Sequence, residues 1–196
     1  LALRGAKKQL DEKVAPLAGL AAVFIFAMQM INFPVAAGTS GHLIGGALAA
    51  ILIGPWAGVL AVTVVLIVQA LVFADGGLTA IGLNVFIMSV LATLGAWYLF
   101  RLFQKIFPKN RIGFLTATAI ASYLSVPISA LGFTFQFALG GTAAITLDKV
   151  LIAMVGVHSV IGIGEAIITV LTISAVLSVR KDLVFGASKL KVSLVR

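Results

Sequence analysis

The residues best suited to binding a ligand lie in a glycine-rich run in the first quarter of the chain. Residues 38–46 read Gly-Thr-Ser-Gly-His-Leu-Ile-Gly-Gly, and His42 is one of 2 histidines among 196 residues. The sequence contains no cysteine, so a transition metal would have to be bound by nitrogen or oxygen. An imidazole in such a bend can bind a metal, and it can equally cap the helix that follows by bonding to a backbone carbonyl. The residues alone leave both interpretations of His42 open.

A second pair of polar residues, His158 and Glu165, lies inside a long apolar stretch. Residues seven apart lie near one face of a helix, and a charged group inside a bilayer costs about 2.5 kcal/mol or more, so each residue requires an internal partner. One interpretation is a His–Glu or Glu–hydroxyl pair that locks helices together, and the other is a role in transport. Amide side chains in apolar surroundings are expected to form hydrogen bonds between helices; these are Gln29, Asn32, Gln69, Asn84 and Gln136.

The composition places the chain in a membrane. Hydrophobic residues make up 61% of it and charged residues 10%, with a mean hydropathy of +1.19, whereas soluble domains carry about 25% charged residues. The formal net charge of +8 does not indicate nucleic-acid binding, because the basic residues cluster at the ends of apolar stretches and are not interleaved with aromatic residues. We predict an all-α, polytopic transmembrane helix bundle that forms a single integral membrane domain over residues 1–196.

Six apolar segments are predicted to span the lipid bilayer, whose hydrocarbon core is about 30 Å thick. The second segment is short and is followed by Gly54-Pro55, which would bend or break a helix, so this segment can begin inside the glycine-rich run. The six segments cover residues 14–33, 43–53, 56–74, 78–103, 112–139 and 150–179.

The basic residues predict how the segments are oriented. Lysine and arginine gather before the first segment, after the fourth and after the sixth, whereas the junctions at the other side hold only Lys149. The positive-inside rule places the basic junctions in the cytoplasm. The outer junctions then carry His42, Asp75 and Asp148, so possible cation ligands gather on the outer face.

The sequence lacks the motifs of common enzymes. It contains no glycine-rich phosphate loop ending in Lys-Ser/Thr, no Gly-x-Ser-x-Gly and no His-Glu-x-x-His. We therefore predict a binding or transport component that is not an enzyme. Cations such as Co²⁺ and Ni²⁺ suit imidazole nitrogen.

Several segments, in order, resemble the CbiM/NikM family, the metal-binding membrane subunits of energy-coupling-factor cobalt and nickel transporters. The resemblance extends over nearly the whole chain. The matching segments are Gln29-x-x-Asn32-Phe33-Pro34-Val35, Gly38-Thr39-Ser40-Gly41-His42-Leu43, Gly45-Gly46-Ala47-Leu48, Gly54-Pro55-Trp56, Gln69-Ala70-Leu71-x-Phe73-Ala74-Asp75-Gly76-Gly77-Leu78, His158-x-x-Ile161-Gly162-x-Gly164-Glu165 and Arg180-x-Asp182-Leu183-Val184.

The resemblance implies that His42 is a metal ligand. Members of the family have seven spanning helices and begin with a Met-His segment, and the amino terminus and second-residue histidine bind the metal together with the histidine of the Thr-Ser-Gly-His stretch. Those amino-terminal ligands have no positions here, so we expect this chain by itself to bind metal weakly or not at all. Residues expected to support the site, in part by orienting the imidazole, are Asn32, Thr39, Ser40, Asp75, His158 and Glu165.

The resemblance also implies partners in a bacterial or archaeal plasma membrane. These are a transmembrane coupling subunit, two ATPase subunits and a small accessory membrane subunit, and Co²⁺ or Ni²⁺ is the transported substrate. The sequence of residues 74–80 and 180–186 favours cobalt uptake for cobalamin biosynthesis, with nickel uptake as the alternative. Two other hypotheses are a non-transporting structural or assembly subunit and a proton- or ion-coupled carrier that uses His158 and Glu165 as a relay.

Overall fold

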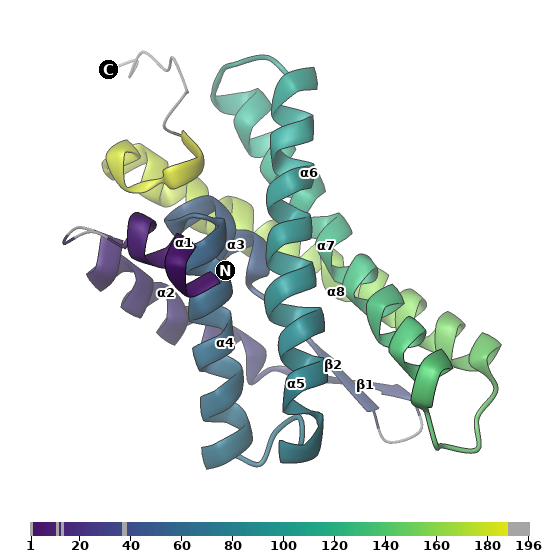
Figure 1. Ribbon diagram of the computed structural model, residues 1–196. Helices are drawn as coiled ribbons and strands as arrows, with labels where there is room; N and C mark the ends of the chain where they lie inside the picture. The colour runs from purple at the N-terminus through teal and green to yellow at the C-terminus, as the bar shows by residue number, and fades with distance from the viewer. Residues whose placement is uncertain (1, 11, 13, 37–38, 188–196) are drawn as a thin grey trace.

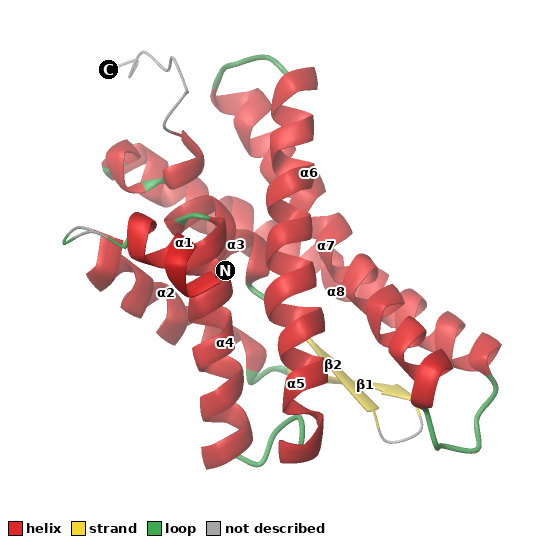
Figure 2. Cartoon of the chain, viewed as in Figure 1, coloured by secondary structure: helices red, strands yellow, loops and turns green. Residues whose placement is uncertain are grey.

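The computed structural model describes residues 2–10, 12, 14–36 and 39–187. Helices account for most of these residues, as predicted, and these residues also form one small hairpin of two strands (Figure 2). The helices are α1 (Ala2–Gln9), α2 (Val14–Gln29), α3 (Gly46–Ile53), α4 (Pro55–Val72), α5 (Ile81–Asn84), α6 (Ala92–Ile106), α7 (Arg111–Gly140) and α8 (Leu147–Val179), and the strands are β1 (Asn32–Ala36) and β2 (Thr39–His42). Shorter helical turns are η1 (Leu78–Ala80), the π-helical η2 (Val85–Leu91), η3 (Lys181–Leu183) and η4 (Phe185–Ala187).

Four helical stretches in the described part of the chain are long and apolar enough to cross a membrane. They correspond to the third to sixth predicted segments and cover Pro55–Val72, Leu78–Ile106, Arg111–Gly140 and Leu147–Val179. The first predicted segment is shorter than expected, because α2 ends at Gln29 and the chain continues as strand β1. The expected six spans are therefore four long helices and two shorter apolar helices, α2 and α3.

The hairpin between α2 and α3 was not predicted. Its strands pair antiparallel, with Asn32 opposite His42 and Phe33 opposite Gly41. Strand β2 packs on α8 so closely that a Cβ added at Gly41 would lie 2.8 Å from Cδ1 of Ile161. The run of small residues is needed for this close approach, and it contains too few apolar side chains for the alternating pattern that normally reveals a strand. Residue 38 of the run lies outside the described residues.

Helix α3 is a half-length helix enclosed by the rest of the bundle. All of its 8 residues are buried, and it packs against α2, α4, α6 and α7. The chain reaches it through residues 43–45, which are not helical, and turns into it at Gly45, where φ is +73°. The second segment was predicted to cover residues 43–53, and its helical part is Gly46–Ile53.

The two ends of the bundle differ in charge, as the distribution of basic residues predicted. The α6–α7 connection and the end of α8 lie toward the same end in Figure 1, where Arg111 Nη2 donates hydrogen bonds to Ser174 O at 3.3 Å and Ser178 Oγ at 2.7 Å. The hairpin, the turn after α4 and the α7–α8 loop lie toward the opposite end (Figure 1). The candidate outer residues are thus gathered at the end that is poor in lysine and arginine.

The short helix α1 caps α4. Oε1 of Gln9 accepts hydrogen bonds from the backbone N–H groups of Trp56 and Ala57, at 3.0 and 2.9 Å, and these first-turn donors have no acceptor within their own helix. We predict that Gln9→Ala lowers the free energy of unfolding by about 1 kcal/mol, seen as a lower midpoint in thermal denaturation of the detergent-solubilised protein. Lys8→Ala changes an exposed side chain of α1 and should leave the midpoint unchanged. Equal shifts in the two variants would contradict the cap.

Candidate metal site

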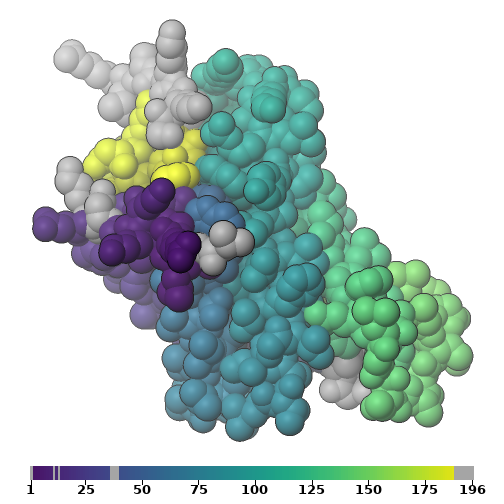
Figure 3. Space-filling view, viewed as in Figure 1, coloured from purple at the N-terminus to yellow at the C-terminus, as the bar shows by residue number. Residues whose placement is uncertain are grey.

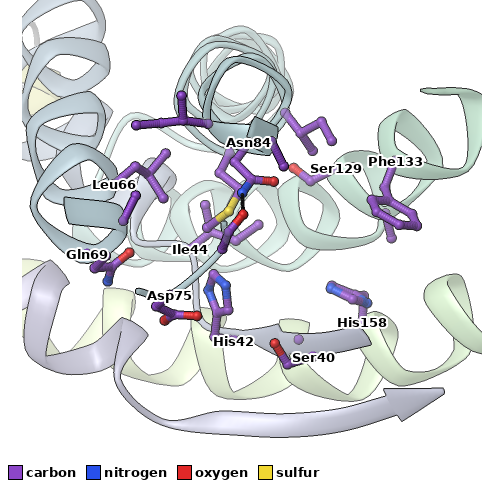
Figure 4. A pocket seen from close by; sticks show the side chains of 18 of the residues that line it. Ser40, His42, Ile44, Leu66, Gln69, Asp75, Asn84, Ser129, Phe133 and His158 are labelled. Atoms are coloured by element: carbon purple, nitrogen blue, oxygen red, sulfur yellow. Dashed lines mark hydrogen bonds between the residues drawn. The ribbon is translucent and has the colours of Figure 1, made fainter. Parts of the chain in front are cut away.

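A pocket of about 370 Å³ lies between the hairpin and helices α4, α5, α7 and α8. Apolar residues, among them Leu66, Met88 and Phe133, form part of its wall. Polar side chains converge on it from segments far apart in the sequence (Figure 4). These are Ser40, His42, Gln69, Asp75, Asn84, Ser129 and His158. The fold therefore brings both histidines of the chain to one cavity.

His42 presents its imidazole to this pocket from the end of β2 (Figure 4). Its Nδ1 lies 3.3 Å from the carbonyl oxygen of Leu43. A carbonyl oxygen only accepts, so a hydrogen bond here requires the proton on Nδ1 and leaves the lone pair of Nε2 available. Burial lowers the pKa of His42 below its ordinary value, while the Leu43 carbonyl and the charge of Asp75 act in the opposite direction. The imidazole is consequently neutral at pH 7, which is the form that binds metals.

His158 has the same arrangement with firmer geometry. Its Nδ1 lies 2.7 Å from the carbonyl oxygen of Met154, one turn earlier in α8, so Nδ1 carries the proton and Nε2 is the free nitrogen. The ring is buried and packs on β2, because its Cε1 would lie 3.1 Å from a Cβ added at Gly41. Figure 4 shows the rings of His42 and His158 on the same side of the pocket. Two imidazoles with free Nε2 atoms therefore line one cavity.

Glu165 lies outside this pocket and bonds to the backbone. Its carboxylate is fully buried; Oε2 accepts from the N–H of Ile44 at 2.9 Å and Oε1 from the N–H of Gly45 at 2.8 Å. Gln29 approaches the same segment from α2, where its Nε2 donates to the carbonyl oxygen of Ile44 at 2.7 Å. The predicted need of Glu165 for an internal partner is met by peptide groups. The described residues show neither a His158–Glu165 pair nor a hydrogen bond between Glu165 and a hydroxyl group.

The Glu165 and Gln29 contacts explain how a non-helical segment is accommodated inside the bundle. Backbone N–H and C=O groups at membrane depth must be paired within the protein because no water is available there. The N–H groups of Ile44 and Gly45 and the carbonyl group of Ile44 are not paired within a helix, so side chains of α2 and α8 supply their partners. The carboxyl group also lies at the amino end of α3, where the helix dipole favours its ionised form. The segment that is fixed in this way begins directly after His42.

The other predicted site residues occupy three kinds of position. Asp75 is partly buried and lines the pocket in the turn after α4, where Asn84 Nδ2 donates to the carbonyl oxygen of Gly76 at 2.8 Å. Ser40 also lines the pocket. Asn32 is exposed opposite His42 in the hairpin and is not among the lining residues. The side chain of Thr39 lies outside the described part of the structure, and no group of three His, Asp or Glu side chains able to hold a metal occurs among the described residues.

Gln69 is a pocket residue that the sequence did not identify as one. Its side chain is 3% exposed, and its Nε2 has no hydrogen-bond partner among the residues described. A buried polar group without a partner costs about 1–3 kcal/mol. The sequence predicted only a hydrogen bond between helices for this amide, and its position six residues before Asp75 in the same segment was the available signal for a place near the site.

The fold and the pocket define a polytopic helical membrane protein with two imidazole rings in one cavity. The chain belongs to the CbiM family, whose model, described as the cobalt uptake substrate-specific transmembrane region, matches residues 1–183. This family is a membrane component of metal transport and is not an enzyme. Cobalt and nickel are the transported substrates named among its members.

Relatives from archaea and bacteria carry names that refer to different metals. A protein of Haloquadratum walsbyi, named for metal transport, is 40% identical over 185 residues, which cover 94% of this chain and 82% of its own. A fused protein of Archaeoglobus fulgidus, named for nickel transport, is 37% identical over 88% of this chain and 57% of its own. The cobalt transport protein CbiM of Acetohalobium arabaticum is 32% identical over 87% of this chain and 69% of its own.

Two solved structures share the fold. A truncated transition metal transporter superposes with a TM-score of 0.82 at 31% identity, covering 90% of this chain and 86% of that one. A second transition metal transporter gives a TM-score of 0.82 at 30% identity, with 92% and 83% covered. The likeness supports the membrane location and the helical architecture described above.

Proposed function

We propose that the chain is the substrate-capture membrane subunit of an energy-coupling-factor transporter that takes up Co²⁺ for cobalamin biosynthesis. The observation that carries this proposal is the pocket in which His42 and His158 both present a free Nε2 (Figure 4). In this proposal His42 is a metal ligand. His158, Ser40 and Asp75 support the site around it, and Glu165 acts at a distance by fixing the segment that follows His42.

The energy for uptake would come from partners. The sequence has no nucleotide-binding motif, so a transmembrane coupling subunit, two ATPase subunits and a small accessory membrane subunit are proposed to complete the transporter. The family assignment supports this division of roles. The metal would enter at the end of the bundle that holds the hairpin, and the whole subunit, as one integral membrane domain, would reorient during the cycle.

Nickel is the alternative substrate, and a specific observation favours it too. The relative of Archaeoglobus fulgidus that is named for nickel transport matches this chain at 37% identity, above the 32% of the cobalt transport protein of Acetohalobium arabaticum. Cobalt is preferred here because of the sequence of residues 74–80 and 180–186. Both ions suit imidazole nitrogen, so the donor set by itself does not discriminate between them.

The two remaining hypotheses have less support. A relay through Glu165 requires its carboxyl group to take up and release a proton, and protonation would weaken the two hydrogen bonds that it accepts from the backbone. A purely structural subunit would not need two imidazoles whose Nε2 lone pairs are available in one cavity.

Uptake measurements test the proposed function. Cells that express the full-length gene with its coupling and ATPase genes should accumulate radioactive Co²⁺ in a saturable manner, and deletion of this subunit should abolish the accumulation. Unlabelled Ni²⁺ is the competitor. Stronger accumulation of Ni²⁺ than of Co²⁺ would establish the alternative substrate. Accumulation that does not depend on this subunit would overturn the transport role.

A further inference from the structure

A second pocket, of about 310 Å³, lies where α6 ends and α7 begins. This is the end of the bundle remote from the hairpin (Figure 1). Three of its lining residues are cationic and none is acidic; the lining consists of Arg101, Gln104, Lys105, Pro108, Lys109, Gly113 and Phe114. The surface of this region, coloured teal, is seen at the top of Figure 3.

The described residues do not neutralise the positive charge of this pocket. Arg101 lies over the ring of Trp97, with its guanidinium carbon 5.7 Å from the ring centroid. Lys105 and Lys109 are exposed. No described residue forms a salt bridge with any of the three; the salt bridge nearest the end of α8 joins Arg180 to Asp182. Membrane topology explains why basic residues occur at this end, but it does not require them to line one cavity.

The start of α7 adds to the attraction for an anion. The helix has 30 residues and is capped by Asn110, whose Oδ1 accepts from the N–H of Gly113 at 2.9 Å. The backbone N–H groups of Arg111 and Ile112 lie in the first turn, so they have no acceptor within the helix. The positive end of the helix dipole therefore lies beside the three cationic side chains, which is an arrangement that favours a phosphate.

The neighbouring surface is apolar and faces outward. Leu102, Ile106 and Ile112 are 51%, 65% and 76% exposed, and they belong to helical stretches that can cross a membrane. Such side chains contact acyl chains in a bilayer. A free phosphate would use only the cationic pocket, whereas a phospholipid would use the pocket and the apolar surface together.

We propose that this pocket binds the headgroup phosphate of an anionic phospholipid, with the acyl chains against Leu102 and Ile106. Basic pockets between membrane helices bind such headgroups. The inference is independent of the metal site, which lies at the other end of the bundle. A bound lipid would tie the α6–α7 end to one leaflet.

Lipid retention tests the proposal. The full-length protein is reconstituted in nanodiscs of phosphatidylcholine with phosphatidylglycerol, extracted, and examined for bound lipid by native mass spectrometry. The triple variant R101Q/K105Q/K109Q should bind phosphatidylglycerol on the order of a hundredfold more weakly than the wild type. The control R4Q/K7Q/K8Q removes three exposed charges from α1 and should retain the lipid. Equal retention in the two variants would overturn the proposal.

Two further experiments distinguish a bound lipid from other occupants of the pocket. Leu102→Ser should weaken binding of phosphatidylglycerol and leave binding of inorganic phosphate, measured by calorimetry, unchanged. Binding of inorganic phosphate as tight as that of the lipid would overturn the lipid assignment in favour of a soluble anion. If the triple variant loses the coupling subunit on co-purification while it keeps the lipid, the pocket is a protein interface and the proposal fails.

Discussion

Replacing His42 by alanine is expected to abolish measurable binding of Co²⁺ and Ni²⁺ to the full-length protein while leaving it folded. The free Nε2 of this residue is the proposed metal ligand, and loss of even an outer partner of a ligand weakens metal binding about 10–100-fold. The side chain is only partly buried, and its one hydrogen bond to a described residue is long, at 3.3 Å, so its removal should cost little stability. Equilibrium dialysis and thermal denaturation measure the two effects.

His158→Ala is the matched variant from the same pocket. If His158 supports the site but is not itself a metal ligand, its loss should weaken metal binding by about 10–100-fold and not abolish it. Wild-type affinity in the His42→Ala protein would rule out His42 as a ligand.

Protons compete with metal for a neutral imidazole, and burial lowers the pKa of His42. Wild-type affinity should therefore change little between neutral pH and the ordinary pKa of histidine, and fall as the pH drops through the lowered value.

Replacing Glu165 by alanine is expected to destabilise the protein by several kcal/mol. The change leaves the N–H groups of Ile44 and Gly45 unpaired in the interior, at about 1–3 kcal/mol each. Glu165→Gln should have an intermediate effect, because one oxygen can still accept while the amide nitrogen faces a donor. Both variants should also weaken metal binding, since the segment that follows His42 loses its support. Thermal denaturation and equilibrium dialysis of the two proteins give these quantities.

Thr169→Val provides a control on the same helix. This residue is buried, and its hydroxyl has no partner among the residues described, so an isosteric apolar side chain should leave stability unchanged or raise it slightly. A proton relay makes a different prediction for Glu165→Gln, namely normal stability and normal metal affinity with transport blocked. That result would show that the carboxylate serves chemistry and not the backbone.

The long helices could be predicted because hydropathy alone determines them. Residues 112–139 and 150–179 correspond to α7 and α8 within a few residues at each end. The start of α3 could not be located in this way, because residues 43–45 are as apolar as a helix interior and only their hydrogen bonds to Gln29 and Glu165 show that they are unwound. The hairpin was missed for a related reason: its position depends on packing against α8 at Gly41 and not on a pattern of side chains.

The candidate site was predicted only in part. His42 was identifiable because histidine is rare in this chain and lies in a run of small residues. The need of Glu165 for an internal partner followed from the cost of a buried charge. Its partners, however, are backbone groups 120 and 121 residues away in the sequence. Because almost every residue has the same backbone groups, the sequence could not indicate which of them Glu165 contacts. The place of Gln69 in the pocket depends on how α4 faces the hairpin, which only the tertiary structure shows.

Helix α8 connects the candidate metal pocket, the non-helical residues 43–45 and the start of α7. Its 33 residues extend about 50 Å at 1.5 Å per residue, and along this length they bear His158 at the pocket, Glu165 at the unwound segment and Ser178 under Arg111 at the basic end. A helix that contacts other segments at three positions along its length cannot slide past one of them without disturbing the other two. We therefore expect α8, the hairpin and residues 43–45 to move together in any conformational change of the protein.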